Sequence, residues 1–241
     1  MEVSEKGKCQ EGQRALQSVV ICDVCHTLYG VNTTAEFVRY ATANIDTTRQ
    51  LAARLVTSRR SPICYALAAA TRLTGIDLGR RALLESLRGL AYEDIRQMAE
   101  KWVEDCLSEF EHGEVHTLLQ QEQQKGAQII LASASLGVIV DAVARKFDAD
   151  VVSSRLHRDT NGHLTGRLAV DATGCKHQLL EQTIDGTEYV TVITDNESDL
   201  PLLRIADRPI VVLRRGDASR KYWARHLAAK AHDTLPAAPS S

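Results

Sequence analysis

The sequence predicts an α/β fold, in which helices cover a parallel sheet and a helical domain is inserted after the first strand. Three short runs of β-branched and other apolar residues have the composition of buried strands: residues 18–22, 128–132 and 189–194. Helical spacing separates these runs, and such alternation is typical of a parallel sheet. Each run ends on a polar residue, which predicts a binding site along one edge of the sheet.

The first strand and the long segment after it define the expected domain division. Residues 34–124 carry helical spacing almost throughout, with apolar side chains on one face, such as Leu83, Leu87, Leu90, Ile95 and Met98. This block leaves the chain directly after the first strand end, so we expect it to form a cap over that end. Residues 1–33 and 125–241 then form a Rossmann-like core.

The remaining elements follow from local signals. Breaks within the helical block are expected at Ser61-Pro62, at residues 74–77 and at Gly89. The second half predicts a helix over 137–147, a short strand at 151–152, a hairpin within 156–170 that turns at 159–162, a helix beginning at Lys176, and a last strand at 209–213. We expect the polar residues 1–17 to be frayed and the tail from Leu235 to be disordered.

Composition narrows the classes of function. The net charge of −2 argues against an obligate nucleic-acid binder. No stretch has the length of about 20 apolar residues that spans a bilayer, and the charged N-terminus lacks the apolar core of a signal peptide. We therefore expect a cytoplasmic protein with reduced cysteines and no membrane partner. A basic run is expected to be a solvated face without function: Arg214, Arg215, Arg220, Lys221 and Arg225.

The residues at the strand ends have the chemistry that phosphoryl transfer requires. Asp23, Ser133 and Asp195 each follow a predicted strand. A carboxylate can attack phosphorus, and carboxylate oxygens suit Mg²⁺. We therefore interpret Asp23 as a nucleophile that shares Mg²⁺ with Asp195, and Ser133 and Lys176 as phosphate contacts. Taken singly, each residue could equally be a turn, a helix cap or an exposed helix residue.

In their order along the chain, these residues resemble the motifs of the haloacid dehalogenase superfamily. The likeness is to its phosphoserine-phosphatase-like members with a helical cap, and it spans residues 18–215. The matching segments are Asp23-Val24-Cys25-His26-Thr27, Ser133, Thr165-Gly166-Arg167-Leu168, Lys176 and Asp195-Asn196-Glu197-Ser198-Asp199-Leu200-Pro201.

The resemblance implies an Mg²⁺-dependent phosphatase that acts on a small phosphorylated metabolite through an aspartyl phosphate at Asp23. It implies a catalytic set of Asp23, Cys25 and Lys176, substrate contacts from Ser133, Ala134 and Lys176, and metal contacts from Asp23, the carbonyl of Cys25, Asp195 and Asp199.

Two positions depart from the family pattern. Cys25 stands where the family has an aspartate that acts as general acid and base, and a thiol with a pKa of about 8.5 is a poor substitute. The chain could be a slow phosphatase, use a substrate whose leaving group needs no proton, recruit His26, transfer phosphate to another acceptor, or only bind a phosphorylated ligand. Asn32 replaces the glutamate that recognises the substrate amine in phosphoserine phosphatases, which disfavours phosphoserine.

Other patterns in the chain receive weaker interpretations. Residues 22–26 also spell C-x-x-C-H, which haem attachment or a dithiol redox site would use, but Cys22 is expected to be buried in a strand. His112 and His116 lack a third metal ligand at helical spacing and are expected at the surface. Five residues of the cap are open candidates for substrate contact: Arg39, Tyr40, Arg59, Arg60 and Tyr65.

Overall fold

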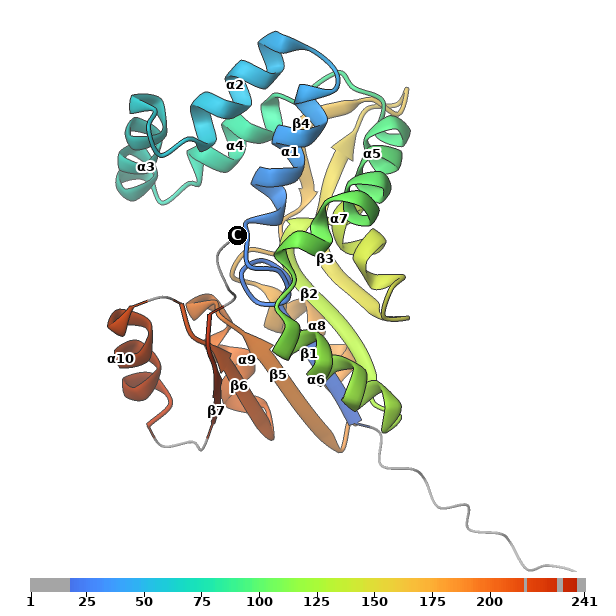
Figure 1. The fold of residues 1–241 in the computed structure, drawn as a ribbon, viewed down its shortest axis with the longest axis vertical. Helices are drawn as coiled ribbons and strands as arrows, with labels where there is room; N and C mark the ends of the chain where they lie inside the picture. Colours follow the sequence, from blue (N-terminus) through green and yellow to red (C-terminus); the bar gives the residue numbers. More distant parts are fainter. Residues whose placement is uncertain (1–17, 215, 229–231, 238–241) are drawn as a thin grey trace, which may run out of the picture.

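The computed structural model describes residues 18–214, 216–228 and 232–237. A seven-stranded sheet has the order β4-β3-β2-β1-β5-β6-β7, and every neighbouring pair is parallel except β3 and β4 (Figure 1). The strands are β1 (Ser18–Cys22), β2 (Gln128–Leu136), β3 (Asp150–Arg158), β4 (Leu164–Val170), β5 (Tyr189–Thr194), β6 (Arg208–Val212) and β7 (Asp233–Leu235). The expected α/β class, with a mostly parallel sheet, is confirmed.

Helices cover both faces of this sheet and extend beyond one edge. They are α1 (Thr33–Ala43), α2 (Thr47–Thr57), α3 (Pro62–Thr74), α4 (Leu78–Glu85), α5 (Tyr92–Asp105), α6 (Gly113–Gln124), α7 (Gly137–Ala144), α8 (Lys176–Ile184), α9 (Leu200–Ile205) and α10 (Asp217–His226), with short 3₁₀ helices η1 (Leu107–Phe110) and η2 (Glu197–Asp199). None of the described helices is long and apolar enough to cross a membrane.

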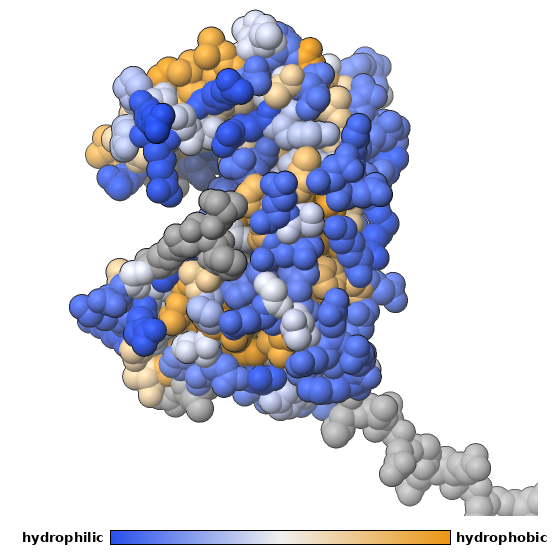
Figure 2. All heavy atoms as spheres, viewed as in Figure 1, coloured by the Kyte–Doolittle hydropathy of each residue, from blue (hydrophilic) through white to orange (hydrophobic). Residues whose placement is uncertain are grey.

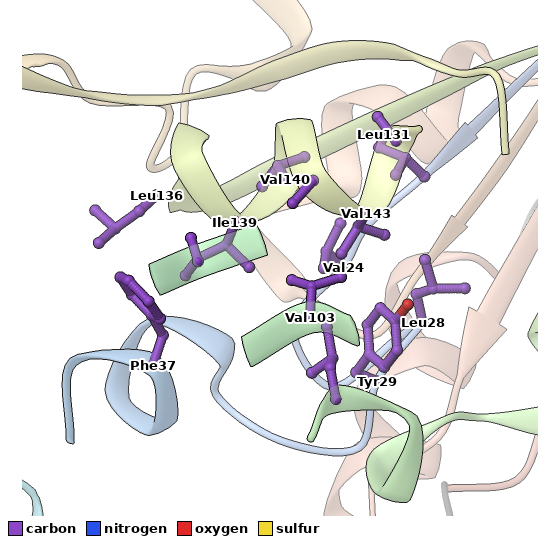
Figure 3. Packing of buried hydrophobic residues seen from close by; sticks show 14 of the residues in the cluster. Val24, Leu28, Tyr29, Phe37, Val103, Leu131, Leu136, Ile139, Val140 and Val143 are labelled. Carbon is purple, nitrogen blue, oxygen red and sulfur yellow. The ribbon is translucent and has the colours of Figure 1, made fainter. Parts of the chain in front are cut away.

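Two apolar clusters hold the layers together, because side chains of a strand alternate between its faces. In β1, Val20 and Cys22 belong to the cluster under α1, α5, α6 and α7, whereas Val19 and Ile21 belong to the cluster under α8, α9 and α10. Figure 3 shows the first cluster, where Leu28 and Tyr29 from the loop after β1 lie near Val103 of α5. The packing of Leu28 and Tyr29 in this cluster thus fixes the loop that follows Asp23.

The expected helix boundaries arise from local caps. Ser61 is the N-cap of α3 with Pro62 at its first position, and Gly75 ends α3 in the left-handed region with φ 71°. The Asp77 side chain accepts a hydrogen bond from the Arg80 backbone N–H at the start of α4. These breaks agree with the sequence interpretation.

The expected cap at residues 34–124 stays a prediction, and the packing favours a smaller one. Helices α2 and α3 stand away from the sheet (Figure 1), whereas α4 contacts β4, α5 contacts α7 and α6 contacts β2. We infer that the division at residue 124 should move toward residue 90, with α5 and α6 belonging to the core layers.

Several boundaries differ from the sequence expectation. Strand β2 continues through Ser133 to Leu136, and helix α7 ends at Ala144 rather than at residue 147. The strand expected at 151–152 extends over Asp150–Arg158, because its second half pairs with β4 as the expected hairpin. Leu235 was expected in a disordered tail but lies in β7, where it pairs with Val212. Residues 1–17 and 238–241 lie outside the described part of the chain.

Candidate active site

The strand register explains why the polar residues meet. Cys22 of β1 lies opposite Leu131 of β2 and Ile193 of β5. One or two residues further along, the three segments reach Asp23, Ser133 and Asp195 at the same edge of the sheet. All three are buried, at 4%, 0% and 2% exposure respectively. The expected convergence of these side chains therefore follows from parallel pairing.

Lys176, the first residue of α8, lies buried between two carboxylates. Its Nζ donates to Asp23 Oδ1 and to Asp199 Oδ2, each at 2.7 Å. Burial opposes the ammonium charge, but the two carboxylates outweigh it and raise the pKa of Lys176. Burial also raises the pKa of Asp199, which further accepts a hydrogen bond of 2.8 Å from Thr194 Oγ1. Lys176 thus remains a cation next to the candidate nucleophile.

Asp23 and Asp195 share one hydroxyl group, which brings their carboxylates together. Thr27 Oγ1 donates to Asp195 Oδ1 at 3.0 Å and lies 3.4 Å from Asp23 Oδ2, while it accepts from the Asp195 backbone N–H at 2.9 Å. Burial, and after it the Asp23 charge, raises the pKa of Asp195. A cation between the two carboxylates would relieve this repulsion.

The donor set fits Mg²⁺ as a partly hydrated ion. Among the described residues, no group of three or more His, Cys, Asp or Glu side chains is arranged around one metal position. Mg²⁺ is held in proteins by one or two carboxylates together with water and substrate oxygens. The paired carboxylates of Asp23 and Asp195 meet that requirement without a third side chain.

Arg214 corrects the expectation for the basic run near the C-terminus. Its Nε donates to Asp195 Oδ2 at 2.6 Å, although 57% of the side chain is exposed. Arg214 therefore borders the site instead of belonging to a solvated face without function. No local pattern indicated this contact, because it depends on where β6 ends beside β5. Arg215 of the same run lies outside the described residues.

A cavity of about 670 Å³ opens above the carboxylates. Asp23, Ser133 and Asp195 form its floor, and residues of α1, α2 and α4 form its walls. In Figure 2 a notch lies between the part that carries α2–α4 and the part that carries α10, and the residues on its α2–α4 side are mainly hydrophilic. The cavity volume of about 670 Å³ is within the range that suits a small polar metabolite.

The comparisons with known proteins agree with this arrangement. The model of the haloacid dehalogenase-like hydrolase family matches residues 20–204. The chain belongs to this family. The matched range of this hydrolase contains Asp23, Ser133, Lys176, Asp195 and Asp199. A search of curated proteins finds no match.

Solved structures share the fold at low sequence identity. A Bordetella pertussis Tohama I protein of unknown function is 15% identical with a TM-score of 0.72, covering 92% of this chain and 99% of that one. A probable phosphoserine phosphatase from Vibrio cholerae is 14% identical with a TM-score of 0.58, covering 91% of this chain and 61% of that one. A phosphoserine phosphatase with a phospho-aspartyl intermediate analogue is 16% identical with a TM-score of 0.52, covering 82% and 87%.

Cys25 lies among hydroxyl groups in this family member. Its Sγ is 2.9 Å from Thr33 Oγ1, which is 2.7 Å from Ser135 Oγ. Burial, followed by the Asp23 charge, raises the pKa of the Cys25 thiol. The thiol is therefore protonated at neutral pH and is no base there. His26, the suggested substitute, is exposed, lines the cavity and has a left-handed backbone with φ 59°.

The rival interpretations of the C-x-x-C-H segment have no support in the geometry. Cys22 is fully buried, and its Sγ donates to the Asp23 carbonyl at 3.2 Å. Burial raises the pKa of Cys22, whereas a redox cysteine needs an exposed thiol with a lowered pKa. Cys22 and Cys25 are both free, so Cys22 is a small core residue of β1.

The structure sorts the candidate residues of the cap. Arg39 and Arg59 line the cavity, whereas Tyr40, Arg60 and Tyr65 are not among its lining residues. Asn32 also lines the cavity, but its Oδ1 accepts from the Ala35 backbone N–H at 3.0 Å and caps α1. Arg39 pairs with Glu36 at 3.1 Å. Of the five candidates, Arg39 and Arg59 thus border the cavity above the carboxylates.

The two histidines that were expected at the surface are packed inside. His112 is 2% exposed, and its Nε2 lies 2.7 Å from the Pro236 carbonyl oxygen. The His116 ring meets Tyr29 and Phe147 edge to face, with each centroid distance at 5.3 Å. The expectation was wrong because the start of α6 packs against the loop after β1, where the His112 N–H donates to the Leu28 carbonyl at 3.0 Å and His116 meets Tyr29. They form no metal site.

Proposed function

We propose that this family member is an Mg²⁺-dependent phosphatase that hydrolyses a small phosphorylated metabolite through an aspartyl phosphate. The observation that supports it most is the buried Lys176 ammonium between Asp23 and Asp199, beside the carboxylate pair of Asp23 and Asp195. A phosphoserine phosphatase of the same fold has a phospho-aspartyl intermediate analogue, which supports the same chemistry here.

Each residue has a role that follows from its charge and position. Asp23 attacks the phosphorus, and the negative charge that develops on the phosphoryl oxygens is met by Lys176, by the Ser133 hydroxyl and by the Ala134 backbone N–H. Asp23, Asp195 and the carbonyl of Cys25 would hold Mg²⁺, which when bound neutralises phosphoryl oxygens. Asp199 suits a supporting role, because its carboxylate is already bound to Lys176 and Thr194.

A panel of phosphate esters tests this proposal. We expect hydrolysis of para-nitrophenyl phosphate to require Mg²⁺ and to stop when a chelator is added, because two buried carboxylates need a counter-ion before they can approach phosphate. Para-nitrophenolate leaves without a proton, so with this ester the first step, which releases para-nitrophenolate, needs no general acid at residue 25. A folded protein that binds Mg²⁺ but hydrolyses no ester in the panel would contradict the proposal.

The thiol of Cys25 favours a second candidate, a phospho-ligand binding protein or phosphotransferase with weak hydrolysis. A protonated thiol cannot activate water, so an aspartyl phosphate at Asp23 would transfer to another acceptor or persist. The two candidates differ in whether hydrolysis of the aspartyl phosphate limits turnover, and a substitution of Cys25 distinguishes them.

We expect Cys25→Asp to increase hydrolysis of alkyl phosphates by roughly 10²- to 10⁴-fold, because the new carboxylate can serve as general acid and base. The gain on para-nitrophenyl phosphate should be smaller, since its leaving group needs no acid. Cys25→Ser is the matched control, because it preserves the size and the contact with Thr33 but adds no carboxylate. If Cys25→Asp instead hydrolyses alkyl phosphates more slowly than the natural protein, the cysteine itself is required for the reaction that the natural protein catalyses.

A further inference from the structure

Arg80 connects the helices above the cavity with three separate segments of the core. Its Nη2 donates to the Ala134 carbonyl oxygen at 2.5 Å and to Ser154 Oγ at 2.9 Å. Its Nη1 donates to Asp171 Oδ1 at 2.7 Å and to Thr173 Oγ1 at 2.6 Å. Only 15% of the side chain is exposed, and Arg80 also lines the cavity. One guanidinium group thus satisfies acceptors from β2, from β3 and from the turn that follows β4.

The helix that carries Arg80 is itself fixed to the core. The chain after α4 pairs with β4, since Gly89 N–H donates to the Leu164 carbonyl at 2.7 Å and Leu164 N–H donates to the Leu90 carbonyl at 2.8 Å. Gly166 has φ 73°, and a side chain at this position would collide with Glu85 of α4. Because these contacts hold α4 against β4, the backbone that carries Arg80 has a fixed position relative to the sheet.

One branch of the Arg80 contacts leads to the phosphate contact at Ser133. The Ala134 carbonyl accepts from Arg80 and, at 3.0 Å, from Ser154 Oγ, which fixes the peptide plane between Ala134 and Ser135. The N–H of that peptide belongs to Ser135 and donates to Ser133 Oγ at 3.1 Å. Ser133 Oγ then acts as acceptor for the backbone, and its own hydrogen is left to donate into the cavity.

The other branch leads to Lys176. Asp171 Oδ1 accepts from Arg80, from the Thr173 N–H at 3.0 Å and from Thr173 Oγ1 at 2.7 Å. The Asp171 carbonyl accepts from Cys175 Sγ at 3.0 Å, directly before α8 begins at Lys176. Arg80 therefore fixes the turn that sets the position of the Lys176 side chain.

We propose that Arg80 is a positioning residue, which orients the Ser133 hydroxyl through the peptide after Ala134 and Lys176 through the Asp171–Cys175 turn. This inference rests on the proposed phosphate site. The guanidinium of Arg80 already donates to four protein acceptors, so its role is to hold the protein groups that would contact phosphate. The helices above the cavity thereby contribute to phosphate binding.

Inorganic phosphate is the probe that tests this role, because it contains no part of a substrate beyond the phosphate group. We expect Arg80→Ala to weaken phosphate binding in isothermal titration by about tenfold or more, and to lower kcat on para-nitrophenyl phosphate by about 10²-fold. Arg80→Lys should recover little, since a single ammonium cannot reach four acceptors. Millimolar guanidinium should restore part of the activity of Arg80→Ala, an effect that a general loss of stability would not produce.

The control is Arg81→Ala, which removes the exposed neighbouring arginine and should match the natural protein in phosphate affinity and kcat. Ser154→Ala removes the second donor to the Ala134 carbonyl, so its effect should be non-additive with that of Arg80→Ala. Unchanged phosphate affinity in Arg80→Ala would overturn the inference, and would point to direct contact with the rest of the substrate if only certain esters were affected. Failure of the proposed function is distinguishable, because it would appear as Mg²⁺-independent or absent hydrolysis in the natural protein.

Discussion

Asp23→Asn is expected to abolish the hydrolysis of phosphate esters, with a fall in kcat on the order of 10⁶-fold, the size of loss that removal of a covalent nucleophile causes. An amide oxygen is a poor nucleophile and gives no stable acyl phosphate. The substitution is nearly isosteric, and Asn Oδ1 can still accept from Lys176 Nζ, so the site should keep its shape. Turnover of para-nitrophenyl phosphate with saturating Mg²⁺ measures this effect.

The matched control is Asp105→Asn, which changes an exposed aspartate at the end of α5 and should leave turnover unchanged. Thermal unfolding should show that both variants are folded. Incubation with a phosphate donor, followed by hydroxylamine, should release phosphate from the natural protein and none from Asp23→Asn. Undiminished turnover in Asp23→Asn would exclude Asp23 as the nucleophile.

Lys176→Met should be the most destabilising change of a charged side chain in the site. Methionine fills a similar volume but leaves Asp23 and Asp199 buried without their shared cation. Removal of one partner from a buried ion pair costs about 3–5 kcal/mol in the free energy of unfolding. The same change removes a positive charge next to the phosphoryl group, so activity should be lost as well. Urea unfolding at neutral pH measures the stability.

The pH dependence of this variant has a definite sign. The pKa values of unpaired buried carboxylates are raised above the ordinary value of about 4, so the folded state binds protons more readily than the unfolded state. The loss in the free energy of unfolding that Lys176→Met causes should therefore be largest near neutral pH and become smaller as the pH falls toward 4. In the natural protein the raised pKa of Lys176 contributes stability below about pH 10.5, which is lost as the pH rises further.

Lys125→Met is the control, because the Lys125 side chain is 66% exposed and pairs with Glu122 at the surface. We expect a change of less than about 1 kcal/mol in its free energy of unfolding at every pH. An equally small change in Lys176→Met would show that the two carboxylates find water or another partner, and would contradict the buried ion-pair arrangement.

The local pattern of the sequence was sufficient for the elements and for the residues at the strand ends. The apolar runs at 18–22 and 189–194 become β1 and β5, and Lys176 begins α8 as expected. Strand composition, turn signals and caps act over a few residues, so they can be recognised in the chain itself. The order of the motifs likewise indicated the family.

Contacts between segments that are distant in the chain could not be predicted from the sequence. Arg80 bonds to Ala134 and Asp171, and Arg214 to Asp195, yet no pattern at either arginine distinguishes it from its neighbours. His112 and His116 were placed on the surface because the faces of α6 were read without the loop that covers them.

The sequence alone determined the α/β class, the family and the polar residues Asp23, Ser133 and Asp195, because these depend on strand periodicity and on short motifs. Only the tertiary structure decided that the cation next to Asp23 is shared with Asp199 and that two arginines join the site. Lys176 neutralises Asp23 and Asp199, Arg214 meets Asp195, and Arg80 supports the peptide beside Ser133. The physical reason is that a long charged side chain pairs with whichever opposite charge lies within its reach in the folded chain. Strand order and helix placement determine which charges those are.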